Sequence, residues 1–440
     1  MNFIKEYEKK TRKSKENFLK LKKLMPGGVS HNLRYYEPYP VFMVKGEGAD
    51  IEDVDGNVYK DLWMGHYSHI LGHNPDIIKS VNKELLDKGS HLGTVNPYEM
   101  ELSYLITKNI PSVEMLRFCS SGTEATTYAI RLARAFTQKS VVVKIAGGWH
   151  GAGSELAKAV KYPYQNGING IFEKIVDLTK FIFFNNIDES YKILKKYKND
   201  IACVILEPVI GEGGFLPAQK KFLDFLREET DKYGALLIFD EIITGFRVEL
   251  SGAQGRYSIN PDLTTLGKIA GGGFNIGIVG GRRNIMELAS PFYKGKNKVL
   301  IGGGTFSAAP YTMRAGVEIL RFLENKGSDF YSDLGAKGDY VRGKIGEFIV
   351  NNNINAVVTG TDSLYMIHFP FEKGAKIKTP ADIGGKTDIY KRENEFKIRL
   401  LNKGLHVMHG GGAISYAHNE SDLKFIVEKT CEVLDEMNLN

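Results

Sequence analysis

Short apolar runs alternate with amphipathic segments through the middle of the chain. The runs are rich in β-branched residues, end near a glycine, aspartate or glutamate, and cover residues 115–119, 141–145, 202–206, 235–239 and 276–279. Between the first two, residues 124–136 have the period of a helix and are rich in alanine and leucine. Strands that alternate with helices predict an α/β fold, with a large, mostly parallel sheet covered by helices. We expect this domain to occupy residues 76–318.

The pattern changes toward both ends of the chain. Residues 40–63 carry apolar stretches around the turn Asp55-Gly56, which predicts a small antiparallel sheet. The C-terminal part predicts helices near 311–351, 387–403 and 422–437, and a strand at 364–369. We therefore expect residues 1–75 and 319–440 to form a smaller α+β domain, with the N-terminal part also at a dimer interface.

Composition places the chain among ordinary globular proteins. Its 440 residues are 42% hydrophobic and 25% charged, with a net charge of +6, and this length predicts more than one domain. No apolar stretch is long enough to span a bilayer and no secretory signal pattern is present, so we expect a cytoplasmic protein without a membrane partner. Cys119, Cys203 and Cys431 are widely spaced, which predicts neither a disulfide framework nor a metal site.

The first segment, residues 5–23, is dense in lysine and has an amphipathic helical pattern. A nucleic-acid or membrane arm is one interpretation of such a segment. Glu6, Glu8 and Glu16 interrupt the basic run, which favours a helix packed on a partner subunit. We therefore expect no nucleic-acid partner.

Asp240 and Lys268 are the strongest candidates for catalytic residues. Asp240 closes a buried apolar run, so it projects from the carboxyl end of a strand, where ligands bind in open α/β sheets. A protonated pyridine nitrogen is a suitable partner for this carboxylate. Lys268 lies in a glycine-rich turn, and a buried lysine with a lowered pKa can form a Schiff base. Alone, either residue could be an ordinary cap or a solvated side chain.

The turn Ser121-Gly122-Thr123 joins a strand to a helix and can bind phosphate through unpaired N–H groups and hydroxyls. Ser121 and Glu124 also form a capping-box pattern, and the two interpretations are compatible. The turn lacks both the Walker lysine and the dinucleotide glycine pattern. A nucleotide-binding oxidoreductase on a similar sheet is therefore disfavoured.

Two further segments follow strands at the same expected edge of the sheet. Trp149 lies in a glycine-flanked turn, where its ring could stack on a cofactor or simply join the core. Ile242, two residues after Asp240, could pack on the opposite face of such a ring. The glycine-rich loop 302–307 could bind an anion or be a flexible connection.

An ordered series of motifs resembles the class III, fold type I aminotransferases, which depend on pyridoxal 5'-phosphate (PLP), and within them the branch that contains glutamate-1-semialdehyde 2,1-aminomutase. The resemblance covers essentially the whole chain. Its motifs are Pro26-Gly27-Gly28-Val29, Asp53-Val54-Asp55-Gly56, Leu71-Gly72-His73, residues 121–134, Trp149-His150-Gly151, Glu207-Pro208-Val209, residues 240–247, Gly252-Ala253-Gln254, residues 261–268, and Gly304-Thr305 with Pro310.

The resemblance implies a role for each matching residue. Lys268 forms the Schiff base with PLP and later moves protons, and Asp240 pairs with the ring nitrogen. Thr305 reaches the phosphate in the neighbouring subunit, which implies a homodimer with shared active sites. The remaining cofactor contacts are assigned to Ser121, Gly122, Thr123, Trp149, His150, Glu207, Glu212 and Ile242. The amino group is carried as pyridoxamine 5'-phosphate, and no metal is implied.

Substrate recognition is less constrained by the resemblance. Arg34 stands at the aminomutase branch's position for the substrate carboxylate, where a surface salt bridge is the ordinary alternative, and Tyr67 at an aromatic position of the substrate pocket. Glu212 replaces an asparagine of the aminomutase, and residues 307–310 and 409–415 also differ from its pattern. We expect transfer of an amino group from an amino acid or amine to an oxo acid, aldehyde or ketone. The alternative is the intramolecular aminomutase reaction that gives 5-aminolevulinate.

Overall fold

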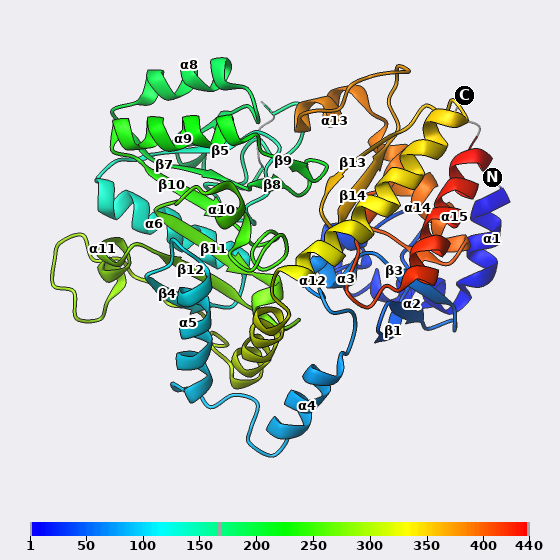
Figure 1. The fold of residues 1–440 in the computed structure, drawn as a ribbon, viewed down its shortest axis with the longest axis horizontal. Coiled ribbons are helices and arrows are strands. Elements are labelled where there is room, and N and C mark those ends of the chain that lie inside the picture. The colour runs from blue at the N-terminus through cyan, green and yellow to red at the C-terminus, as the bar shows by residue number, and fades with distance from the viewer. Residues whose placement is uncertain (1, 165–168, 438–440) are drawn as a thin grey trace. The chain divides into compact units, whose positions relative to one another are not determined.

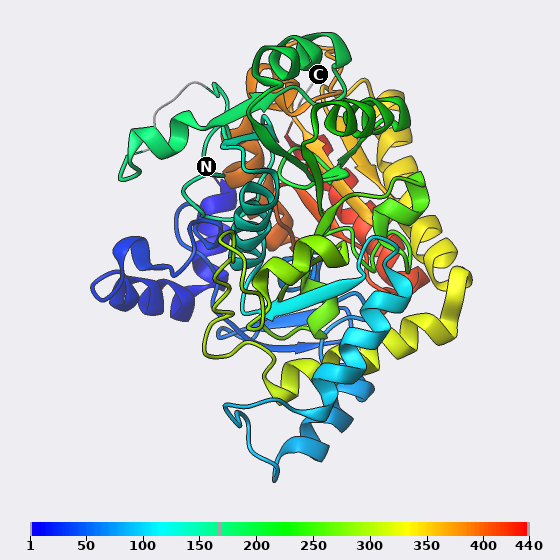
Figure 2. The ribbon, with the colours of Figure 1, turned by 90° about the vertical axis from the view of Figure 1, so that its left-hand side faces the viewer.

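The computed structural model describes residues 2–164 and 169–437, which form two compact units. The sheet unit holds the described residues of 76–333 together with 378–385, and the terminal unit holds 2–75, 334–377 and 386–437. Figure 1 colours the ribbon along the chain, and Figure 2 shows it turned by 90°. The division of the chain into domains at 1–75, 76–318 and 319–440 stays a prediction.

A seven-stranded sheet with the order β4-β12-β11-β10-β7-β5-β6 forms the centre of the sheet unit. Its strands are β4 (Met115–Cys119), β5 (Val141–Ile145), β6 (Thr179–Ile182), β7 (Ile201–Leu206), β10 (Leu236–Asp240), β11 (Leu263–Gly267) and β12 (Gly277–Gly281). Strand β12 is antiparallel to β4 and β11, and the other neighbours are parallel. The predicted α/β fold with a mostly parallel sheet is confirmed. Strands β6 and β11 were not predicted, because threonines and a lysine interrupt their apolar pattern.

Helices and short connections complete the sheet unit. They are α4 (Asp76–Leu85), α5 (Pro97–Asn109), α6 (Gly122–Thr137), α7 (Glu173–Asp177), α8 (Ile187–Tyr197), β8 (Val209–Ile210), β9 (Leu216–Pro217), α9 (Lys220–Tyr233), α10 (Gly252–Tyr257), η3 (Lys268–Gly271), α11 (Arg283–Met286), η4 (Glu287–Ala289) and α13 (Pro380–Lys386). Helix α6 packs along the sheet, and its buried alanines allow close contact with Ile205, Ile238 and Val279 of the strands.

The terminal unit joins both ends of the chain in two small sheets. The four-stranded sheet has the order β1 (Met43–Glu47), β2 (Asp50–Asp53), β3 (Val58–Asp61), β15 (Leu405–His406), and the three-stranded sheet has the order β13 (Val357–Thr361), β14 (Leu364–His368), β16 (Gly411–Ala413). Strands β1, β2 and β3 are antiparallel neighbours, as predicted, and β15 adds to β3 in parallel. The predicted smaller α+β fold of both chain ends is thereby confirmed.

The helical segments of the terminal unit are α1 (Asn2–Lys10), α2 (Arg12–Leu21), η1 (Pro26–Gly28), η2 (Asn32–Arg34), α3 (Met64–Tyr67), the π-helical turn η5 (Lys391–Phe396), α14 (Lys397–Asn402) and α15 (Glu420–Glu436). The amphipathic face of α1 packs on its own unit, since Tyr7 is buried and its hydroxyl donates to the carbonyl of Tyr39 at 2.7 Å. The carboxylate of Asp55 caps α2 by accepting from the N–H groups of Lys13 and Ser14. None of the described helices is long and apolar enough to cross a membrane.

Helix α12 (Pro310–Asn351) is interrupted at Gly327, which has φ 62° and ψ −150°. A side chain is strongly disfavoured in this backbone conformation, so glycine separates two helical segments here. The single long helix predicted near 311–351 is therefore two helices, and the predicted helix near 387–403 includes a π-helical turn.

Candidate active site

The carboxyl ends of β7, β10 and β11 lie side by side at one edge of the sheet, because these three neighbours are parallel. Glu207 follows β7, Asp240 ends β10 and Lys268 follows β11. The turn after β4 and the loop after β5 reach the same edge, since both strands run in the same direction as the central three. Five separate segments therefore meet where open α/β sheets bind their ligands.

Asp240 is a buried carboxylate held by three groups. Its Oδ1 accepts hydrogen bonds from the hydroxyl of Thr265 at 3.0 Å and from the N–H of Ile242 at 3.2 Å, and its Oδ2 lies 2.7 Å from Nδ1 of His150. Burial lowers the pKa of His150, although the charge of Asp240 opposes this shift. A neutral imidazole that donates from Nδ1 fits this arrangement, so His150 fixes the orientation of the carboxylate.

Lys268 offers an amine suited to covalent chemistry. Among the described residues none accepts a hydrogen bond from its Nζ, and burial lowers its pKa to about 8 against the opposing charges of Asp240 and Glu207. Its backbone has φ 48°, in the left-handed region that non-glycine residues rarely adopt. A substantial fraction of this lysine is therefore the neutral, nucleophilic amine near neutral pH.

Glu207 connects the loops that follow β5 and β7. Its Oε1 accepts from the N–H of Trp149 at 2.9 Å, and its Oε2 accepts from the N–H of Gly211 at 3.0 Å. Burial, assisted by the charge of Asp240, raises the pKa of Glu207 to about 8. Glu212 is partly exposed, and its charge is the smallest of the influences that oppose the lowering of the Lys268 pKa by burial.

The N-terminus of α6 faces the same edge of the sheet. The hydroxyl of Ser121 accepts from the N–H of Glu124 at 3.3 Å, as the capping pattern predicted. The reciprocal bond differs, because the Glu124 carboxylate accepts from the N–H of Ser120 at 2.7 Å rather than from that of Ser121. The N–H groups of Gly122 and Thr123, in the first helical turn, have no intrahelical partner and can receive an anion.

The loop after β5 is brought directly against this helix terminus. A side chain at Gly151 (φ 84°) would meet the Cα of Thr123 at 2.7 Å, so only glycine allows the approach. The N–H of Ala152 then donates to the Thr123 hydroxyl at 3.2 Å. Trp149 keeps 37% of its surface exposed and is thus not a core tryptophan. Ile242 packs close to Gly122, where an added Cβ would meet its Cδ1 at 3.0 Å.

These residues fit PLP in their chemistry. The structure combines a partly neutral lysine amine, a buried aspartate for a ring nitrogen, an exposed indole and an isoleucine for the two ring faces, and free N–H groups for a phosphate. In the described chain, Nε2 of His150 is also buried without a hydrogen-bond partner. The individual roles of these residues stay predictions.

Three predicted site residues, Thr305, Arg34 and Tyr67, belong to other segments of the chain. Thr305 is exposed in a loop whose Gly303 carbonyl accepts from the Ser120 hydroxyl at 3.4 Å, so the loop runs beside the turn before α6. Arg34 and Tyr67 belong to the terminal unit. Arg34 is exposed, donates to the Ser30 hydroxyl at 2.9 Å and lines a cavity of about 420 Å³, whereas Tyr67 is buried at the end of the α3 turn.

Sequence reasoning missed two polar residues that support the site. Thr265 bonds Asp240, and aligning β10 with β11 in parallel would have found it, since the register pairs these two residues. Lys144 on β5 is fully buried, and its pKa is lowered to about 7 by burial. A lysine within the run Val141-Val142-Val143-Lys144-Ile145 was the available signal.

Comparison with known proteins agrees with this geometry. The family model of class-III aminotransferases matches residues 33–411. Glutamate-1-semialdehyde 2,1-aminomutase of Methanosarcina acetivorans is 38% identical over 96% of this chain and 97% of its own. Among solved structures, an omega-transaminase from Sphaerobacter thermophilus has a TM-score of 0.88 at 28% identity, covering 96% of this chain and 97% of its own. A transaminase with PLP bound has the same TM-score at 31% identity, with 97% and 98% covered.

Proposed function

Because the chain belongs to the class III aminotransferase family, whose members use PLP, we propose that it moves an amino group from an amino acid or amine donor to a separate oxo acid, aldehyde or ketone. The observation that carries this proposal is the buried pair at the sheet edge: the Lys268 amine, with a pKa of about 8, beside Asp240. Small molecules are its substrates.

Each residue of the sheet edge has a distinct task in this proposal. PLP, when bound, supplies an aldehyde for amino groups and a ring that delocalises negative charge. Lys268 would hold the aldehyde of PLP through its amine, and as a base it would move the proton at the donor Cα. Asp240 holds a proton on the ring nitrogen, and His150 holds Asp240.

The other assigned residues hold the cofactor in place. Ser121, Gly122 and Thr123 would bind its phosphate at the N-terminus of α6, where the helix dipole favours an anion. Trp149 and Ile242 would contact opposite faces of the ring. Glu207 would hold the loops after β5 and β7 beside the cofactor, and Glu212, in the loop after β8, would add a carboxylate at the same site.

Recognition of a carboxylate substrate is proposed for the terminal unit. Arg34 is exposed at a cavity whose wall includes Val41, Phe42 and the indole of Trp63. The Nε1 of Trp63 is buried without a hydrogen-bond partner in the described residues. A guanidinium and a spare indole N–H suit a carboxylate attached to an apolar body, and Tyr67 would add an aromatic contact.

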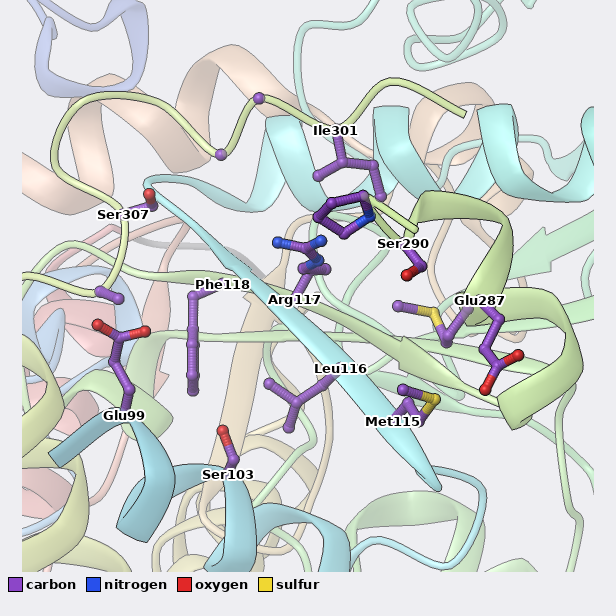
Figure 3. A pocket seen from close by; sticks show the side chains of 15 residues that line it. Glu99, Ser103, Met115, Leu116, Arg117, Phe118, Glu287, Ser290, Ile301 and Ser307 are labelled. Atoms are coloured by element: carbon purple, nitrogen blue, oxygen red, sulfur yellow. The ribbon is translucent and has the colours of Figure 1, made fainter. Parts of the chain in front are cut away.

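We propose a homodimer with shared active sites, in which Thr305 reaches the phosphate bound by the partner. A cavity of about 470 Å³ lies beside β4, which is the outer strand of the seven-stranded sheet next to β12. Figure 3 shows Glu99, Arg117 and Ser307 around it. Several large apolar side chains are more than half exposed in the segments that line this cavity or directly precede them. They are Leu92, Val95, Met100, Tyr104, Leu300 and Phe306. Such exposed surface is typical of a subunit interface.

The cytoplasm, which keeps thiols such as Cys119 reduced, is the proposed location of the protein.

The aminomutase reaction is the second candidate, favoured by the 38% identity to an archaeal aminomutase over nearly the whole chain. Two local features favour the aminotransferase reaction, in which the donor and the acceptor are separate molecules. Glu212 replaces the asparagine that the aminomutase pattern has near the phenolic oxygen of the cofactor, and residues 307–310 lack its Gly-Asn. Both reactions use Lys268 and Asp240, so these two residues do not distinguish them.

Two assays test the proposal. The purified protein should show a visible absorption band that Lys268→Ala abolishes, while Lys158→Ala, in a nearby loop, should keep it. Absence of the band in the wild type would overturn the cofactor assignment. Glutamate-1-semialdehyde is then supplied alone: no turnover without both a donor and an acceptor supports the aminotransferase, and conversion to 5-aminolevulinate without either supports the aminomutase.

A further inference from the structure

Lys144 is a buried lysine that no catalytic role explains. It is the next-to-last residue of β5, fully buried, and its neighbours across the sheet are Phe181 and Ile205. Within the described residues it has no ion pair. Placing an ammonium in such surroundings costs several kcal/mol unless its three donors are all satisfied, so an apolar residue would serve the strand better. The contacts of its amino group indicate its task.

The amino group of Lys144 donates three hydrogen bonds, all to one loop. Its Nζ donates to the backbone carbonyls of Gly148, Leu156 and Lys158, each at 2.9 Å. Gly148 lies on the outgoing arm of the loop, immediately before Trp149, and the other two lie on the returning arm. Gly147 N–H also donates to the carbonyl of Ala159 at 2.8 Å, closing the neck of the loop below the ammonium.

The clamped loop carries the residues assigned to the cofactor ring. Trp149 follows the Gly148 carbonyl directly, and its N–H donates to Glu207. His150 reaches Asp240 at 2.7 Å, and its carbonyl accepts from the Thr126 hydroxyl of α6 at 2.8 Å. A displacement of the Gly148 arm would therefore move both the indole and the imidazole that orients Asp240.

We propose that Lys144 is a positioning residue of the cofactor site: its ammonium joins the two arms of the loop 146–159 and thereby fixes the Trp149 ring and the His150–Asp240 hydrogen bond. This inference rests on the proposed function for the identity of the ligand, whereas the position of the loop can be tested without it. Lys144 contacts neither substrate nor cofactor in this proposal and acts only through the loop.

Fluorescence of Trp149 in the cofactor-free, full-length protein tests the positioning step. The chain has two tryptophans, so Trp63→Phe leaves Trp149 as the sole indole. In that background Lys144→Met should raise acrylamide quenching of Trp149 toward that of a solvent-exposed indole. Lys158→Met is the matched control: it removes a lysine of the same loop whose Nζ donates to the Val176 carbonyl instead, and quenching should stay unchanged.

PLP binding tests the consequence for the ligand site. Lys144→Met should weaken PLP binding and reduce turnover by about 10- to 100-fold, the range found when a supporting partner of a ligand site is lost, and should diminish the induced circular dichroism of the cofactor band. Lys144→Gln, whose amide keeps two donors, should be intermediate and serves if the methionine variant does not fold. A lowered Tm with unchanged quenching, PLP affinity and circular dichroism would overturn the proposal. Failure of the wild type to bind PLP would instead overturn the proposed function.

Discussion

The residues proposed for the cofactor and those proposed for the substrate are built on different kinds of backbone. Glu207, Asp240 and Lys268 lie at the ends of three parallel strands, so the sheet itself sets their spacing. Arg34 ends a single 3-10 turn, and Tyr67 ends the α3 turn. The first region is suited to chemistry common to all substrates, and the second to selection among them. Changes at the sheet edge should therefore affect every substrate, and changes in the terminal unit only some.

The largest effect is expected for Asp240→Asn, which keeps the shape of the side chain but removes the charge that holds a proton on the ring nitrogen. Turnover should fall by roughly 10²- to 10⁴-fold, the range contributed by a positioned proton-transfer group, equally for all donors, with PLP still bound. Asp262→Asn is the matched control: this buried carboxylate pairs with Arg227 and Arg282 and should affect only stability. Steady-state rates for three unrelated donors test this, and an unchanged kcat would refute the role of Asp240.

A smaller, selective effect is expected for Arg34→Ala. Loss of a charge-assisted hydrogen bond, worth about 1.5–3 kcal/mol, should raise KM for carboxylate substrates roughly 10- to 100-fold and leave simple amines unaffected. Arg12→Ala, an exposed arginine of α2 in the same unit, is the control. KM values for a matched acid and amine pair decide the matter. Equal changes for both substrates would show that Arg34 does not bind the carboxylate.

The contrast also explains how much the sequence predicted. Strand ends are readable where a short apolar run gives way to a turn with glycine, serine or a charged residue, and β4 and β5 were predicted at their observed bounds. The meeting of Glu207, Asp240 and Lys268 then follows from parallel pairing alone. β11 was missed because Thr264 and Thr265 hide its apolar pattern, even though Thr265 bonds Asp240.

Other features have no local signature in the sequence. Four consecutive residues, Met64 to Tyr67, have φ between 47° and 69°, and only one of them is a glycine. Long-range bonds hold this turn: Asp61 accepts from the N–H groups of Trp63 and Met64 and also lies 2.7 Å from both His73 and His406. Tertiary contacts of this kind override local propensity, so the backbone around Tyr67 could not be anticipated.

A pH-dependent effect on stability is expected from Glu207. Its pKa rises from 4.5 in the unfolded chain to about 8 in the fold, so between these values the folded protein holds a proton that the unfolded chain has lost. The contribution of Glu207 to the stability of the cofactor-free protein should therefore fall as the pH rises through this window. Glu207→Gln should remove this component of the slope, whereas the exposed Glu228→Gln should not. Urea midpoints between pH 5 and pH 8 measure it, and identical slopes in the wild type and Glu207→Gln would contradict it.

The smallest predicted effect is a change in stability when glycine replaces either of two residues with a left-handed backbone. Gln138, with φ 57°, ends α6 and donates one exposed hydrogen bond to the Ala135 carbonyl. Gln138→Gly should therefore stabilise the protein by up to about 1 kcal/mol, because it removes a left-handed strain of roughly 1–2 kcal/mol and adds a backbone-entropy cost of roughly 0.5–1 kcal/mol. His66, with φ 58°, stacks edge-on against Trp63 at 4.7 Å between ring centroids.

His66→Gly relieves the same kind of strain but loses that ring contact, worth about 0.5–1.5 kcal/mol. The two terms oppose each other, so its net change should lie near zero or be destabilising. Urea unfolding of both variants compares them directly. Equal stabilisation by both substitutions would mean that the His66 ring contributes nothing to the α3 turn, and the left-handed backbone beside Tyr67 would then need another cause.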